Sequence, residues 1–108
     1  MIKLVLLKSG EEVISQIEEM VVNEKVVGYF FKLPAAVKLY KDTEYSIKLT
    51  PWMPLSKDEI IPVVTDWVIS IVEPVDRLKE MYVEGLKKHE DRKSASTDSG
   101  ESDSGDTD

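Results

Sequence analysis

Apolar residues in the first 72 positions favour alternate places, in short runs separated by polar turns. Alternation with a period of two is typical of β-strands. Gly28, Pro34 and Pro51 interrupt two of the runs, and such residues mark bends or bulges in strands. We therefore expect five strands, at about 2–8, 12–22, 26–40, 45–53 and 63–72.

Strongly bent strands linked by tight turns predict a mainly β protein, a small five-stranded antiparallel β-barrel over residues 1–72. The first run, 2–8, is apolar on both faces, which suits a strand that is buried on both sides. A flat antiparallel sheet covered by a helix remains the alternative.

After residue 72 the spacing of apolar residues changes towards 3.6. Val75, Leu78, Tyr82 and Leu86 then share one face with His89. This pattern predicts a C-terminal amphipathic α-helix over residues 73–91. Residues 92–108 follow as a disordered acidic tail rich in Ser and Asp, because the segment has too little apolar surface to offset its ordering entropy.

Charge is unevenly distributed along the chain. The net charge of the 108 residues is −7, but the last fifteen residues hold five acids and no base. Residues 25–57, in contrast, hold six lysines and two acids. The tail could compete with nucleic acid for this basic middle, although a block of acids more often serves solubility.

The composition argues against an enzyme. Without cysteine there are no disulfides, thiolate metal sites or thiol nucleophiles. His89 is the single histidine, on a surface helix, and the neighbouring acids Glu11 and Glu12 point to opposite strand faces. No phosphate-binding glycine loop or metal-ligand spacing appears. We expect no catalytic residue, no cofactor and no metal, and no apolar run is long enough for a membrane span.

The stretch LLKSGEEVISQI resembles the first half of the Sm motif of the Sm-like family, which includes Sm, LSm and Hfq proteins. Leu7, Gly10, Val13, Ser15 and Ile17 occupy the motif positions, with Ser15 in place of the usual glycine. The strand order matches as well. The whole chain is most similar to Sm-like proteins of marine cyanophage type, which implies a phage protein that acts in the host cytoplasm.

The uridine site of the family is not kept in this sequence. Its aspartate and asparagine correspond by spacing to Val21 and Lys25, and Asn23 is nearby but off register. The arginine-glycine pair before the last strand is replaced by residues 56–59, and the helix follows the barrel rather than preceding it.

The resemblance implies a closed homomeric ring of five to seven copies, in which the fourth strand of one subunit pairs with the fifth of the next. The candidate interface residues are apolar residues of these strands, namely Ile47, Leu49, Trp67, Ile69 and Ile71. Such a contact between different edges must close or polymerise.

Lysines interleaved with aromatic residues favour a low-specificity RNA-binding function, since lysines neutralise phosphates and aromatic rings stack on bases. The candidate RNA-binding residues are Asn23, Lys25, Tyr29, Lys38 and Lys57. The alternative is a non-enzymatic structural or assembly ring that binds protein through the barrel or through the apolar stripe of the helix.

Overall fold

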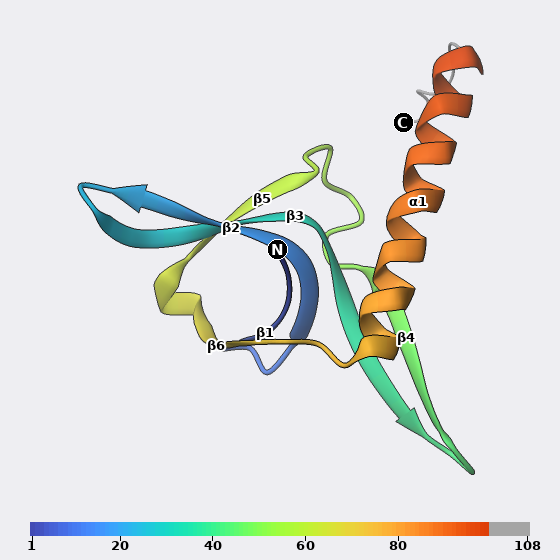
Figure 1. The fold of residues 1–108 in the computed structure, drawn as a ribbon, viewed down its shortest axis with the longest axis horizontal. Coiled ribbons are helices and arrows are strands. Elements are labelled where there is room, and N and C mark those ends of the chain that lie inside the picture. Colours follow the sequence, from blue (N-terminus) through green and yellow to red (C-terminus); the bar gives the residue numbers. More distant parts are fainter. Residues whose placement is uncertain (100–108) are drawn as a thin grey trace.

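The computed structural model describes residues 1–99, with the side chains of residues 1–92. These residues form one strongly bent antiparallel sheet and one helix (Figure 1). The elements in chain order are β1 (Ile2–Leu7), β2 (Glu12–Val22), β3 (Lys25–Lys41), β4 (Tyr45–Pro51), β5 (Ile60–Val64), the 3-10 turn η1 (Thr65–Trp67), β6 (Val68–Val72) and α1 (Asp76–Ser99).

The bend of β3 organises the sheet. This strand of 17 residues pairs with β2 along most of its length, while its first half pairs with β5 and its second half with β4. At the bend, Leu33 has a φ of 50° and precedes Pro34, and the β2–β3 register shifts between Ile14 and Gln16. The predicted mainly β fold with strong bends and a C-terminal helix is confirmed.

Two details of the predicted barrel are wrong: the sheet has six strands rather than five, and the barrel is not closed. The predicted strand 63–72 is divided by the helical turn of η1. Because β5 pairs with β3 whereas β6 pairs with β1, a turn rather than a ladder connects these two strands. The sheet path therefore ends at β4 on one side and at β6 on the other.

The sheet has a core on each face. The inner core, inside the curve of the sheet, consists of Val5, Leu7, Val13, Ile17, Phe31 and Val63. The outer core lies between the sheet and α1 and is built on Ile14, Leu78 and Tyr82. In β1, Val5 and Leu7 belong to the inner core, whereas Ile2 and Leu4 pack against the outer core, which explains why this strand is apolar on both faces, as predicted.

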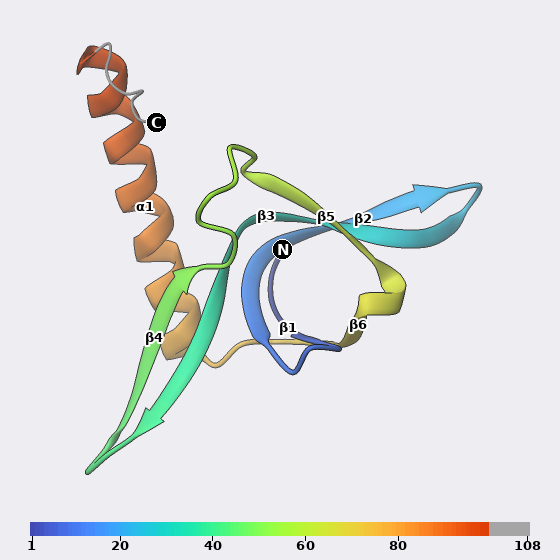
Figure 2. The ribbon, with the colours of Figure 1, turned by 180° about the vertical axis from the view of Figure 1, so that it is seen from behind.

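Helix α1 lies alongside β4 and covers the outer core (Figures 1 and 2). It begins three residues later than predicted, and it continues through residues 92–99, which had been assigned to the tail. Residues 100–108 of the predicted tail lie outside the described part of the chain. Within the described part, no helix has the length and apolarity needed to cross a membrane.

Candidate functional site

The titratable residues offer little catalytic chemistry. Among the described side chains, those of residues 1–92, no group of three histidine, cysteine or acidic residues could hold a metal ion. His89 Nε2 lies 3.0 Å from Glu59 Oε2, so the histidine connects α1 to the loop before β5. Lys3 of β1 forms an ion pair with Glu73, which lowers the pKa of this exposed carboxyl chiefly through the hydrogen bond from Lys3. Both pairs connect chain segments.

The loops that hold the RNA-binding candidates Asn23, Lys25 and Lys57 lie in different parts of the molecule. Asn23 and Glu24 form a two-residue turn with φ values of 50° and 66°, and Lys25 follows as the first residue of β3. Figure 1 shows the β2–β3 turn at one end of the sheet, whereas the loop that contains Lys57 joins β4 to β5 on the side of α1. A single subunit therefore does not bring Lys57 beside Asn23 and Lys25.

The other two RNA-binding candidates have different environments. Tyr29 is partly buried and packs against the inner core. Lys38 is exposed in the second half of β3, directly opposite Lys48 of β4. Lys38 is therefore the one of the two that offers a free side chain to a partner.

The candidate interface residues also divide. Ile47 and Leu49 pack against the outer core of their own chain, and Ile71 packs against the inner core. Trp67 and Ile69, in contrast, are 44% and 59% exposed. All five remain predicted interface residues, but only the last two present large apolar surface to solvent.

Exposed apolar residues on β5 were missed by the sequence analysis. Ile60 and Val64 are 51% and 64% exposed, and Phe30 is exposed beside them because it pairs with Pro62 of β5. The alternation of Ile60, Pro62 and Val64 with the inward Ile61 and Val63 carries this signal. Residues 60–62 lie outside the predicted strands, which place only Val63 and Val64 of β5 in a strand, so the full alternation is not visible in the prediction.

Within the described residues, the hydroxyl of Tyr82 makes three hydrogen-bond contacts with backbone groups. This side chain is only 3% exposed, and its oxygen accepts a hydrogen bond from the Gln16 N–H at 3.1 Å. The hydroxyl donates towards the carbonyl oxygens of Lys32 (2.8 Å) and Leu33 (3.0 Å). Burial raises the pKa of Tyr82 above its ordinary value. The phenol thereby attaches α1 to the bend between β2 and β3.

Ser15 completes this buried arrangement. It is fully buried, and its Oγ lies 3.0 Å from both the Lys32 and the Gln16 carbonyl oxygens. Backbone groups that the register shift removes from the ladder are satisfied in this way by two side chains. A glycine at this position would provide no such hydroxyl.

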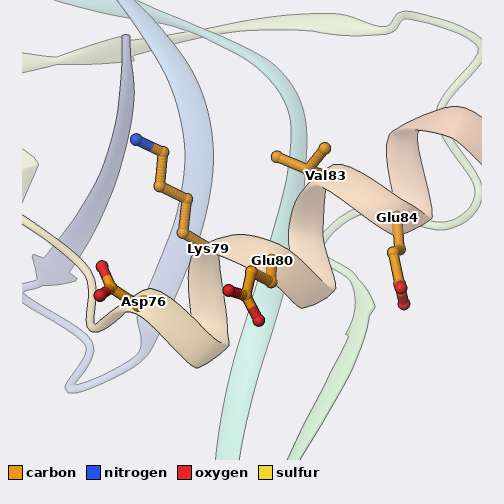
Figure 3. Close-up of a pocket in the computed structure, with 5 residues that line it drawn as sticks. All are labelled: Asp76, Lys79, Glu80, Val83 and Glu84. Atoms are coloured by element: carbon orange, nitrogen blue, oxygen red, sulfur yellow. The ribbon is translucent and has the colours of Figure 1, made fainter.

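Two hollows of the surface involve α1. One of about 300 Å³ lies between α1, β3 and β4, where Gly85 leaves open space and His89 and Arg92 are among the lining residues. Another follows α1 alone, where Asp76, Glu80 and Glu84 recur every fourth residue (Figure 3). In this view the Lys79 amine points away from Glu80 and Glu84. Neither hollow converges on a reactive group.

The β3–β4 hairpin carries three exposed lysines. Lys38 and Lys48 face each other across it, and Tyr40 lies two residues from Lys38 on the same face. Ser46 and Thr50 complete this surface, which we call the hairpin face.

Comparisons with known proteins identify no family for this chain. No protein-family model matches the chain, and no curated protein matches its sequence.

Proposed function

We propose that this chain is a subunit of a closed homomeric ring of the Sm-like kind, with five to seven copies, which binds single-stranded RNA with low specificity and catalyses no reaction. The observation that carries the ring is the open sheet. Its path ends at β4 and β6, and apolar side chains are exposed along β5, η1 and β6.

Strand edges with unpaired backbone groups are ready sites for pairing with another chain. Exposed apolar patches at such edges favour a protein contact over a solvated surface. The edge formed by β4 and β5 differs from that of β6, so pairing between copies is heterologous. Proline cannot donate to a ladder, so Pro51 and Pro62 limit the number of hydrogen bonds on one side.

The packing of α1 against the sheet favours an RNA partner over a protein partner. A protein-binding role for the apolar stripe of α1 would require Tyr82 and Leu86 to be exposed. Tyr82 belongs to the outer core and Leu86 packs against it, so Val75, which is 66% exposed, is the one of the three that remains free for such a contact. The basic and aromatic residues of the β3–β4 hairpin, in contrast, remain accessible.

The ring is tested by light scattering on a sizing column at fixed protein concentration. The mass of one subunit is 12.2 kDa, so the measured mass gives the number of copies. We expect a discrete species of five to seven times this mass that takes up a short oligo(U) RNA in a second run. A monomer, or a mass that grows without limit with concentration, would contradict the closed ring. A discrete ring that ignores RNA would leave the structural or assembly role.

A matched pair of variants tests the β6 edge. Ile69→Lys places a charge on the exposed part of β6 and should reduce the mass to that of smaller species. Val75→Lys adds the same charge at a residue that is 66% exposed and lies outside the strands, so its mass should stay that of the unmodified protein. Equal masses for both variants would show that β6 is not an assembly edge.

A further inference from the structure

The β3–β4 hairpin projects from the curved sheet, and α1 lies against one of its faces (Figures 1 and 2). Val37, Ile47 and Leu49 point to that covered face, since they pack against the outer core. Because side chains alternate along a strand, the residues between them point to the opposite face. There Lys38 pairs with Lys48, Tyr40 with Ser46, and Ala36 with Thr50.

The two lysines of the hairpin face carry like charges at directly opposite positions. Side chains directly opposite in an antiparallel pair have Cβ atoms about 5 Å apart, and like charges at such positions are unfavourable. Within the described residues, neither Lys38 nor Lys48 forms an ion pair or a side-chain hydrogen bond. The two acids of this hairpin lie in the turn beyond the strands, and Glu11 and Glu12 line the same hollow as Lys38, although neither forms an ion pair with it. An anion held between the two ammonium groups would relieve their repulsion.

The remaining residues of the face favour a particular anion. Tyr40 is 49% exposed and lies one pair further along the hairpin, so its ring can stack on a planar group. Ser46 and Thr50 add exposed hydroxyls. Phosphates alternate with flat, stackable bases in a nucleic acid strand, and the bases are free to stack on aromatic side chains only when the strand is single.

We propose that the hairpin face is the surface that binds the RNA strand, with Lys38 and Lys48 on its phosphates and Tyr40 stacked on a base. This inference rests on the proposed RNA-binding function and deepens it, because it moves the contact from the β2–β3 turn to the hairpin. In a ring the face occurs once in each subunit, so a weak site is strengthened by avidity.

Lys41 provides an internal control for charge. It belongs to the same strand, but it lies on the other face, where its Nζ is 5.6 Å from the centre of the Tyr45 ring. Lys87 is an exposed lysine on α1. Lys41→Gln with Lys87→Gln therefore removes the same charge as Lys38→Gln with Lys48→Gln, but away from the hairpin face.

The test is fluorescence anisotropy of a labelled oligo(U) RNA titrated with the full chain over a range of salt concentrations. We expect the Lys38/Lys48 variant to bind about tenfold more weakly at low salt, with a salt slope reduced by about 1.4, since each single-strand phosphate contact contributes about 0.7. The Lys41/Lys87 variant should stay within about twofold of the unmodified protein. Tyr40→Ala should weaken binding about tenfold without changing the slope, and Tyr40→Phe should restore it.

Equal losses in the two double variants would mean that only total charge matters and would overturn the hairpin face. An unchanged affinity for the Lys38/Lys48 variant would do so as well, while leaving RNA binding itself intact. If the unmodified protein binds no RNA, both this inference and the RNA part of the proposed function fail. Light scattering reports the ring independently: a monomer that shows the expected losses would support the hairpin face and refute the ring.

Discussion

Removing the hydroxyl of Tyr82 tests how the helix is held to the sheet. In Tyr82→Phe the ring still fills the outer core, but the Gln16 N–H and the Lys32 and Leu33 carbonyls lose their contact with the phenol. The Lys32 carbonyl keeps the hydroxyl of Ser15, so its loss is partial. The Gln16 N–H is left facing an apolar ring edge, which is the costlier change.

The magnitude follows from these contacts. A typical net hydrogen bond contributes about 1 kcal/mol, and a buried group left unsatisfied costs about 1–3 kcal/mol. We therefore expect Tyr82→Phe to lower the free energy of unfolding by about 2 kcal/mol, a decrease in Tm of about 10 °C for a chain of this size. Urea unfolding measures the change in the free energy of unfolding. The protein concentration is kept fixed, because assembly of the chain would also contribute to its stability.

Two readouts distinguish the anchor from a general loss of packing. Amide hydrogen exchange should show faster exchange at Gln16 than in the unmodified protein, since this N–H donates to the phenol. Tyr45→Phe removes a hydroxyl from a side chain that is largely exposed, so it should change stability by less than about 0.5 kcal/mol. A loss below that value in Tyr82→Phe, with unchanged exchange at Gln16, would refute the role of the hydroxyl.

Further predictions concern the same fold. Burial raises the pKa of Tyr82 above its ordinary value of 10.0. The protonated phenol therefore contributes its full stabilisation below pH 10.0, and this stabilisation is lost as the pH rises through the higher pKa of the folded state. Urea unfolding of Tyr82→Phe should show no such loss of stability at high pH. Gly28→Ala should lower the free energy of unfolding in urea by about 2 kcal/mol, since the new Cβ would lie 2.8 Å from the Val63 carbonyl oxygen. Gly85→Ala should raise it by about 1 kcal/mol, because the new Cβ meets no atom within 4 Å and alanine favours a helix. The reverse order would contradict the close approach of β5 to Gly28. Glu24→Gly should raise the free energy of unfolding by about 1 kcal/mol, because a non-glycine residue at φ 66° is strained, and a measured decrease would argue against this turn.

The sequence predicted those parts of the fold that depend on local periodicity. The alternation in β2 assigns Val13 and Ile17 to the inner core, and the helical spacing assigns Leu78 and Tyr82 to the covered face of α1. Neither assignment requires knowledge of distant residues. Both are therefore visible in short windows of the chain.

The parts that were not predicted depend on long-range contacts. The segment from Val63 to Val72 contains no glycine or proline that would predict a break. The turn η1 nevertheless divides it, at the point where the chain stops pairing with β3 and begins to pair with β1. Leucine rarely adopts a positive φ. Leu33 does so because its N–H donates to the Glu59 carbonyl at 2.7 Å, a contact that forms only when the loop before β5 folds back.

The candidate site shows the same limit. Lys38 and Lys48 both belong to the lysines interleaved with aromatic residues, but only Lys38 is among the candidates, because the pairing of the two depends on the register of β3 and β4. The predicted loops at Asn23 and Lys57 followed from the family resemblance. A single subunit keeps them apart, so this prediction requires neighbouring copies to bring such loops together.

The bend at Leu33 and Pro34 connects the two proposed surfaces. It directs the first half of β3 to β5, whose exposed apolar residues belong to the proposed assembly edge, and the second half to β4, which carries the hairpin face. The phenol of Tyr82 holds α1 over the other side of that hairpin. The lysines depend on the β3–β4 ladder rather than on the helix. Loosening α1 should therefore expose Ile47 and Leu49 and lower stability, while the affinity of the hairpin face for an RNA strand persists as long as the ladder does.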